Sequence, residues 1–388
     1  MLEKALYGSK LYYAWLGFLI MVIIAGLLAY LHQFDQGLGV TGMSRDVSWG
    51  LYIAQFTFMV GVAASAVMVA IPYYLHDYKE FSRIVILGEF LAVAAVVVCI
   101  LFIFVDLGQP ARIFNMILHP SPNSIMFWDM VALSGYLLIN LVIGWTVLGD
   151  ERKGSVPAAW LRVLAIISIP WAISIHTVTA FIYAGLAGRA YWLSAIMAAR
   201  FLASAFAAGP ALLIILCLFL RKHTSFKTSV PAIQSLAQIV CYAMIANLFF
   251  FLLEIFTAFY SNIPGHMATF RVLFTGMDGF NNLVPFMWGF VILAVIGITM
   301  LLIPPLRRNE KYLTLALAAV FVAAWLDKGV ALVLGGFAPN AFGRVTGYIP
   351  SLTEITVILG VYAVGALLLT ILYKVVIDVR VQSTAYEH

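Results

Sequence analysis

Asp106 is the residue of this sequence best placed for chemistry, because it ends the apolar run 84–105. A carboxylate at the end of a membrane helix is unfavourable unless it faces protein, water or a partner charge. Gly108 and Pro110 stop the helix and turn Arg112 back toward the same surface. We therefore expect a site at this surface, and pairing of Asp106 with Arg112 to cap the loop is the structural alternative.

His176 is the second candidate, because it is the histidine that lies well inside an apolar run. At helical spacing it shares a face with Thr179 and Tyr183. A lone histidine in such a run is often a satisfied core residue, but other polar and aromatic residues are expected at its depth. These residues are Trp49, Tyr52 and Gln55 at the start of the second run and His32 at the end of the first.

This mixture of residues suits quinone chemistry. A quinone ring needs apolar or aromatic walls, and its carbonyl oxygens need groups that exchange protons as electrons move. A partly buried carboxylate and an imidazole, which ordinarily titrates near neutral pH, meet that need. With Asp106 and His176 as the proton-exchanging pair, Trp49, Tyr52, Gln55, Arg112 and His32 are the expected quinone contacts.

Other cofactors are not expected in this chain alone. Haem held by two histidines needs a facing pair at one depth, and the sequence has one deep histidine, although His32 lies at the end of a run. The cysteines Cys99, Cys217 and Cys241 show no CxxC spacing, and an iron–sulfur cluster usually needs four thiolates. We therefore predict no haem, no iron–sulfur cluster and no metal bound by this chain alone.

A second group of ionisable residues lies at similar depth in later runs. Asp327 and Lys328 are adjacent, so they point about 100° apart on a helix and need separate partners. Arg200 and Glu254 offer the matching charges. The group is either a structural charge network or part of a proton relay. The proton-pathway candidates are Glu89, Asp129, Arg200, Glu254, Asp327 and Lys328.

The composition predicts an all-α polytopic membrane protein. Hydrophobic residues make up 64% of the chain, charged residues 10%, and the mean hydropathy is +1.03. A bilayer core of about 30 Å takes about 20 helical residues, and ten runs are long enough. They lie near 11–31, 50–75, 84–105, 125–149, 160–184, 193–220, 235–260, 284–306, 312–335 and 352–377. The residues do not alternate in polarity as in a barrel.

The basic residues predict the orientation. Fifteen of the 22 Lys and Arg residues lie at the N-terminus, in the turns after the even-numbered runs and in the C-terminal tail, and five lie on the other side. Both termini are therefore expected in the cytoplasm, with the protein in the cytoplasmic (inner) membrane. The first run has no small-residue cleavage site, so we expect it to be retained. Membrane orientation explains the pI near 9.0, and no nucleic-acid partner is expected.

A weak internal repeat predicts how the helices are grouped. Tyr191-Trp192 enters the sixth run much as Ser48-Trp49 enters the second, and small residues follow midway in each. Because four helices separate the two, the repeat is parallel. We expect one integral membrane domain, 1–388, in which helices 2–5 (50–184) form a four-helix bundle with the quinone site. Helices 6–9 (193–335) form a second bundle, and helices 1 and 10 flank the two.

The motifs resemble those of the NrfD/polysulfide reductase membrane-subunit (PsrC-type) family. They are Ser48-Trp49-Gly50-Leu51-Tyr52, Asp106-Leu107-Gly108-Gln109-Pro110 with Arg112, His119-Pro120-Ser121-Pro122-Asn123-Ser124, and His176. A narrower resemblance links the chain to ten-helix subunits of sulfate-reducer complexes, namely the DsrP-type subunits of DsrMKJOP complexes, followed by HmcC-like subunits. Thr41–Asp46, Asp327-Lys328-Gly329 and Gly336–Pro339 carry it.

The resemblance implies a menaquinone or ubiquinone site at the outer end of the first bundle, and we expect menaquinone. It also implies a periplasmic-side, ferredoxin-like iron–sulfur subunit as electron partner. A multihaem cytochrome c and further membrane redox subunits of a DsrMKJOP-type complex would accompany it. The chain alone is not expected to be catalytic. The alternatives from other classes are a secondary transporter and a membrane anchor without a quinone site.

Overall fold

The computed structural model describes residues 2–155, 158–226, 228–340 and 342–385. These residues are nearly all helical, contain no β-strand, and include ten helices long and apolar enough to cross a membrane. The predicted all-α polytopic class is therefore confirmed. The ten spans are α1 (Lys10–Gln36), α2–α3–η3 (Leu51–Leu75), α4 (Ser82–Asp106), α6 (Ile125–Lys153), α7 (Ala159–Ala184), α8 (Met197–His223), α9 (Val230–Tyr260), α11 (Val284–Leu302), α13–η7–α14 (Glu310–Gly335) and α15 (Leu352–Ala385).

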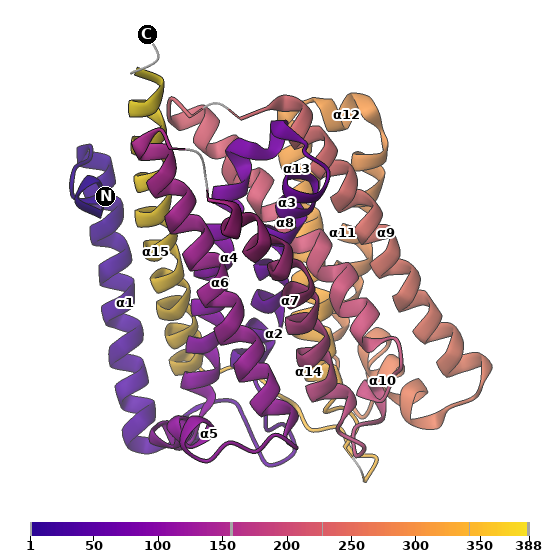
Figure 1. Cartoon of the computed structure of the whole chain (residues 1–388). Coiled ribbons are helices and arrows are strands. Elements are labelled where there is room, and N and C mark those ends of the chain that lie inside the picture. The colour runs from indigo at the N-terminus through magenta and orange to yellow at the C-terminus, as the bar shows by residue number, and fades with distance from the viewer. Residues whose placement is uncertain (1, 156–157, 227, 341, 386–388) are drawn as a thin grey trace.

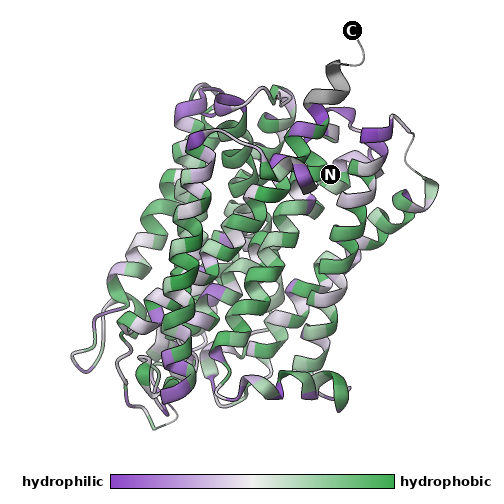
Figure 2. Cartoon of the chain, turned by 90° about the vertical axis from the view of Figure 1, so that its left-hand side faces the viewer, coloured by the Kyte–Doolittle hydropathy of each residue, from purple (hydrophilic) through white to green (hydrophobic). Residues whose placement is uncertain are grey.

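The spans run back and forth between two ends (Figure 1). The basic end is where α1 begins and α15 ends, and it holds the connections that follow the second, fourth, sixth and eighth spans. The loop end holds the longer connections that follow the first, third, fifth, seventh and ninth spans, among them the segments 37–50, 107–124 and 261–283. Figure 2 shows hydrophilic residues gathered at the two ends and a largely hydrophobic body between them.

Local signals in the sequence explain where several helices begin and end. The side chains of Ser9, Ser229 and Asn309 accept hydrogen bonds from backbone N–H groups in the first turns of α1, α9 and α13. Gly154 takes the left-handed conformation (φ 65°) that ends α6. These caps satisfy backbone groups that a helix leaves unpaired at its ends.

The spans pack in two closed sets. In the first set, α4 lies between α2 and α6, and α7 closes the set by packing on α6 and α3. In the second, α9 lies between α8 and α11, and α13 closes the set by packing on α11 and α8. The span α15 packs on α4, and α1 packs on α15, so these two helices flank the first set.

Small residues bring the two sets into close contact. A Cβ added at Gly209 of α8 would lie 2.7 Å from the backbone nitrogen of Ser65 and 2.9 Å from the carbonyl oxygen of Val62. The indole rings of Trp49 and Trp192, which precede α2 and α8, stack with their centroids 5.6 Å apart. The residues that suggested the repeat therefore meet at the interface between the sets.

Two spans are irregular where the sequence suggested smooth helices. The second span breaks at Ala64, between α2 (Leu51–Ala63) and α3 (Ser65–Ala70), beside Gly209. The ninth span contains a π-helical stretch, η7 (Trp325–Ala331), between α13 (Glu310–Ala324) and α14 (Leu332–Gly335). π-Helical stretches are frequent at functional sites, and this one carries Asp327 and Lys328.

Corresponding loops cover the two sets differently. In the second set, the segment after α9 forms α10 (Pro264–Phe274), whose Phe270, Val272 and Leu273 are buried. In the first set, the segment after α4 forms only η5 (Pro110–Phe114) and α5 (Asn115–Leu118). Phe114 and Leu118 there are 62% and 68% exposed. The loop end of the first set is therefore less completely filled.

Candidate functional site

A cavity of about 370 Å³ lies at the loop end of the first set of helices. Its volume is within the range of small-molecule sites. Its lining combines apolar and aromatic side chains with two carboxyl groups. The lining residues are Trp49, Ile53, Phe56, Ile100, Ile103, Asp106, Leu107, Ile113, Phe114, Met116, Ile117, Met126, Asp129, Met130, Leu133, Ser134, Ile182 and Tyr183. All four spans of the set and the segment 107–117 contribute.

Asp106 is the last residue of α4, and its Oδ1 atom is buried without a hydrogen-bond partner among the described residues. The backbone carbonyl before it is held from α1. The Gln33 amide donates from Nε2 to the Val105 carbonyl (2.7 Å), and the Tyr52 hydroxyl donates to Gln33 Oε1 (2.7 Å). The chain of contacts fixes the backbone next to Asp106 and leaves its carboxyl group open to a ligand.

Asp129, near the start of α6, is the second carboxyl group of the cavity. Its side chain is buried, and its Oδ1 accepts a hydrogen bond of 2.6 Å from Thr179 Oγ1. Thr179 lies on the face of α7 that the spacing with His176 and Tyr183 predicted to point inward, and all three side chains are buried. Among the described residues, the cavity therefore has one carboxyl with an unpaired oxygen and one carboxyl positioned by a hydroxyl group.

Aromatic rings form the wall of the cavity nearest the second set of helices. Trp49 packs edge-on against Tyr183, whose hydroxyl shares a short hydrogen bond with Thr57. Trp192 and Phe337 continue this cluster toward the loop end. The Arg189 guanidinium lies 4.4 Å from the Phe337 ring centroid, and burial lowers its pKa. The wall is rigid because each ring contacts at least two others.

His176 is fully buried on α7 but is not among the residues that line the cavity. Neither ring nitrogen has a hydrogen-bond partner among the described residues. The ring is close enough to Lys328 of η7 for electrostatic interaction. The imidazole therefore lies on the face of α7 that carries Thr179, outside the cavity lining that contains Asp106 and Asp129.

The other predicted quinone contacts lie in different places. Arg112 and His32 are exposed, and the described residues contain no ion pair between Arg112 and Asp106. Gln55 is buried, and its Oε1 accepts from Trp325 Nε1 (2.8 Å) and from the Tyr362 hydroxyl (2.6 Å). Of the predicted contacts, Trp49 lines the cavity described above, together with the predicted proton-exchanging residue Asp106, and Tyr52 holds Gln33 behind it.

Gln55 lines a separate cavity of about 540 Å³, between α2, α4, the ninth span and α15. Its walls are almost entirely apolar, with residues such as Phe58, Leu91 and Leu369. No carboxyl group, histidine or lysine is among the described residues that line it. It can hold a hydrocarbon chain, but it lacks groups that exchange protons.

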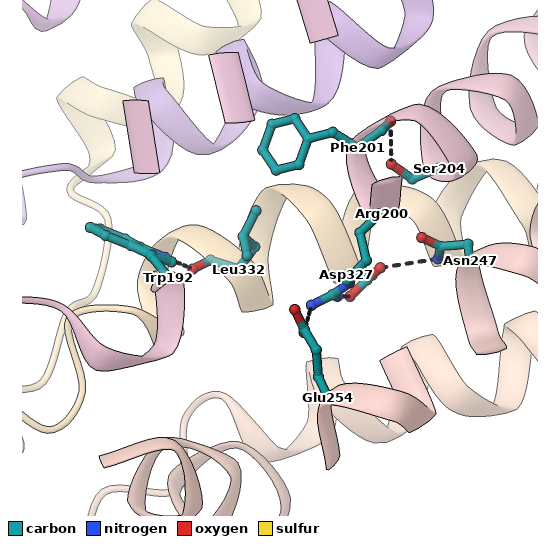
Figure 3. A network of polar contacts seen from close by, with 8 residues as sticks. All are labelled: Trp192, Arg200, Phe201, Ser204, Asn247, Glu254, Asp327 and Leu332. Atoms are coloured by element: carbon teal, nitrogen blue, oxygen red, sulfur yellow. Dashed lines mark hydrogen bonds and ion pairs between the residues drawn. The ribbon is translucent and has the colours of Figure 1, made fainter. Parts of the chain in front are cut away.

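The charged residues of the second set form a network (Figure 3). The Arg200 guanidinium contacts Glu254 through a short ion pair and Asp327 Oδ1 at 2.6 Å. Asn247 Nδ2 donates to Asp327 Oδ2 at 3.1 Å. All of these side chains are buried. The expected pairing of Asp327 with Arg200 is present. Glu254, which has the charge that would match Lys328, pairs with Arg200 instead.

Lys328 and Glu89 are buried without hydrogen-bond partners among the described residues. The Lys328 ammonium group lies 4.3 Å from the centre of the Phe201 ring, and a Cβ on Gly61 of α2 would lie 3.3 Å from it. It therefore projects from the second set toward the first. Glu89 is 1% exposed, on α4 nearer the basic end.

Two buried polar residues contribute although their positions suggested no role. Gln33 follows His32 directly, so the side chains point about 100° apart, and only Gln33 turns inward. Glu354 at the start of α15 accepts from the backbone N–H groups of Gly42 (3.1 Å) and Leu51 (3.0 Å). Burial and the Glu354 carboxylate raise the pKa of Tyr348, so its hydroxyl stays protonated and donates to Glu354. Glu354 lies inside the apolar run 352–377, which was an available signal, whereas Gln33 lies just beyond the run 11–31 and gave none.

The ten spans define a multi-pass membrane protein with a largely apolar cavity near one membrane surface, into which two carboxyl groups project. Residues 39–337 match the polysulphide reductase NrfD family, and the chain belongs to this family. The matched region includes both sets of helices and the whole cavity.

Three relatives are similar over nearly their full length. A putative membrane component of dimethyl sulfoxide reductase from Halobacterium salinarum is 27% identical, over 91% of this chain and 88% of its own. The Hdr-like menaquinol oxidoreductase integral membrane subunit of Archaeoglobus fulgidus is 24% identical, over 95% and 94%. The menaquinone reductase integral membrane subunit of Nitratidesulfovibrio vulgaris is 21% identical, over 93% and 90%. Each is named as a membrane component of an oxidoreductase.

Proposed function

We propose that this protein is the quinone-reactive membrane subunit of a respiratory redox complex, with menaquinone as its quinone. The proposal rests mainly on the cavity at the loop end, which is lined by apolar and aromatic side chains and by two carboxyl groups, Asp106 and Asp129. The names of two relatives, a menaquinol oxidoreductase subunit and a menaquinone reductase subunit, support the choice of quinone.

The lining fits a quinone by its chemistry. The aliphatic residues of α4 and α6 suit an apolar ring and chain, and Asp106 Oδ1 is a buried oxygen without a partner among the described residues. Bound quinone would supply two-electron chemistry in which its carbonyl oxygens gain or lose protons. Asp106 is the group that holds or releases a proton at the cavity, and Trp49 and Tyr183 orient a ring against the wall.

Proton exchange continues from the cavity through buried groups in this proposal. Asp129 contacts Thr179, and His176 lies one turn from Thr179 on the same face of α7. Lys328 is the next ionisable group, followed by Asp327, Arg200 and Glu254. Glu89 supplies a separate position nearer the basic end. A structural charge network remains the competing role for the second set.

The proposed electron partner is a ferredoxin-like iron–sulfur subunit on the loop end, which the basic-residue distribution predicts to be periplasmic. A multihaem cytochrome c and other membrane redox subunits complete a DsrMKJOP-type complex of dissimilatory sulfur metabolism in the narrower form of the proposal. Cytoplasmic termini and the inner membrane belong to the same prediction. Co-purification with optical and iron analysis tests the partner set, and purification without haem or iron–sulfur proteins contradicts it.

Asp106→Asn in the assembled complex tests the site. Turnover with quinone is expected to fall on the order of 100-fold to 10,000-fold, the usual contribution of a proton-exchanging group, while complex assembly stays normal. Asp35→Asn is the matched control, because Asp35 is an exposed acid at the same end of the protein. Normal turnover and normal quinone binding in Asp106→Asn would remove Asp106 from the site.

Proton translocation has its own test, because quinone chemistry at the loop end does not require it. In reconstituted complex, Glu89→Gln and Glu254→Gln are expected to reduce charge movement per electron if the buried residues form a path. Unchanged charge movement in both variants, with turnover preserved, rejects the path and leaves the quinone assignment intact.

A secondary transporter is the second candidate, and the irregular spans favour it. The break at Ala64 and the π-helical η7 lie within two facing spans, and transporters often use discontinuous helices near the middle of the membrane. Purified protein without partners should move no solute in liposomes if it is a quinone-reactive subunit. Solute uptake by the isolated chain supports the transporter, and assembly defects without any change in quinone affinity support a passive anchor.

A further inference from the structure

A cavity of about 670 Å³ lies at the basic end, the opposite end of the spans from the quinone-site residues. It is formed by the last turns of α8 and the first turns of α13, two helices that pack on each other. Its lining residues are Ile215, Leu218, Phe219, Arg221, Lys222, His223, Glu310, Lys311, Thr314 and Leu315. The proposed quinone chemistry uses none of them.

The part of this cavity nearest the helix ends is cationic. Arg221, Lys222 and Lys311 carry positive charge, and the one acid in the lining, Glu310, forms an ion pair with Arg221. This pairing leaves the charges of Lys222 and Lys311 without a matching acid among the described lining residues, and both side chains are exposed. The polar part therefore carries an excess of positive charge that is contributed by two helices.

The deeper part of the cavity is apolar and open to the membrane. Phe219 is 57% exposed and Leu315 is 53% exposed, and both lie within spans. Ile215 precedes Lys222 by seven residues, which on a helix corresponds to about 10 Å. A cationic part thus lies about one head-group length from an apolar part that faces lipid.

We propose that this cavity binds an anionic phospholipid, with its phosphate group between Lys222 and Lys311 and an acyl chain along Phe219 and Leu315. Basic pockets between membrane helices on the cytoplasmic side are suited to anionic head groups. A soluble anion would use the cationic part alone and would not need the apolar surface below it. A neutral lipid would leave the two lysine charges unmatched.

Native mass spectrometry of the purified complex in phosphatidylglycerol and in phosphatidylcholine tests the proposal. The unmodified complex is expected to retain phosphatidylglycerol in preference to phosphatidylcholine. Lys222→Gln/Lys311→Gln should weaken retention about 30-fold, since each of the two basic residues contributes about 1 kcal/mol near a membrane surface. The control is Lys79→Gln/Lys153→Gln, which removes the same charge from exposed residues at the same end, outside the cavity.

Two further measurements separate a lipid from a free anion. Leu315→Trp fills the apolar part without changing charge, and it should also release phosphatidylglycerol. Inorganic phosphate at millimolar concentration should not displace the lipid. Equal retention of both lipids, equal loss in the control variant, or displacement by inorganic phosphate would each overturn the proposal.

Discussion

The two sets of four spans use buried charge in opposite ways. In the second set, Arg200 contacts two acids, and Asn247 satisfies one of them further. In the first set, Asp106 has an oxygen without a partner among the described residues, and Asp129 contacts a neutral threonine hydroxyl. Removing one member of a buried ion pair leaves the other charge buried without compensation and destabilises the protein. A buried acid without a partner can instead bind a ligand. The difference separates a structural centre from a candidate reaction centre.

The two sets can be compared residue by residue, because among the described residues a paired and an unpaired residue occupy corresponding positions in them. The fifth and ninth spans each have 26 residues, and His176 and Asp327 occupy the same position counted from their starts. Asp327 is paired, and His176 has no hydrogen-bond partner among the described residues. The loops differ in the same sense, since α10 fills the end of the second set and α5 leaves a cavity in the first.

The largest expected effect comes from breaking the network in the second set. Arg200→Met leaves Glu254 and Asp327 buried without their cation, and we expect a loss of about 3–5 kcal/mol in the free energy of unfolding. Unfolding in detergent, followed by tryptophan fluorescence, measures it. The triple variant Arg200→Met/Glu254→Gln/Asp327→Asn should recover most of the loss. A loss below about 1 kcal/mol in the single variant would mean that the network is not structural.

The next largest effect is expected from replacing one methionine in each set with tryptophan and comparing the loss of stability. Met287 of α11 is fully buried, so Met287→Trp should cost about 1–3 kcal/mol through overpacking. Met130 of α6 lines the cavity, so Met130→Trp should cost less and should abolish binding of a quinone analogue. Unfolding measurements and equilibrium binding check the pair. Equal destabilisation by both substitutions would contradict an open cavity in the first set.

Tyr52→Phe gives a smaller effect and tests the support behind Asp106. The change leaves Gln33 Oε1 without the donor it has in a buried position, which costs about 1–3 kcal/mol. We expect quinone affinity to fall while the network of the second set is unaffected. Tyr13→Phe on α1 is the control, because that hydroxyl contacts an exposed backbone carbonyl at the basic end. Unchanged stability would mean that Gln33 finds another partner.

Arg112→Ala and His32→Ala should have the smallest effects. Both side chains are exposed and outside the cavity lining, and substitutions at such positions usually change stability by less than about 0.5 kcal/mol. Quinone affinity should also stay within about twofold, an energy of less than about 0.5 kcal/mol. A tenfold loss of affinity in Arg112→Ala would return this residue to the site.

The sequence predicted the spans because long apolar runs leave few alternatives in a membrane. It also predicted a cluster of charge at one depth in the second set, because signs and depths follow from position in a run. It could not tell whether Glu254 meets Arg200 or Lys328, since both basic residues have the required depth. That choice depends on how the helices rotate against one another.

The unpredictable rotation of the helices also explains which residues of the candidate site were placed wrongly. His32 and Gln33 are adjacent, and the direction in which each points depends on where α15 and α4 pack. Trp49 and Asp106 could be placed together because both lie at helix ends on one side. Gln55 lies one turn beyond the first residue of α2, and its side chain faces away from the cavity that Trp49 lines. It therefore contacts Trp325 and Tyr362 instead. Depth could be predicted from the sequence, but the facing direction could not.

The hydrogen bond from Gln33 to Val105 connects the most peripheral span with the candidate reaction centre. Only 11% of the apolar part of α1 is buried within the chain, so its outer surface is available to lipid or to another subunit. Any tilt or shift imposed on α1 from outside would move the carbonyl that directly precedes Asp106. The first span, most of whose surface faces outward, is therefore tied by a single side-chain hydrogen bond to the backbone that carries the acid of the cavity.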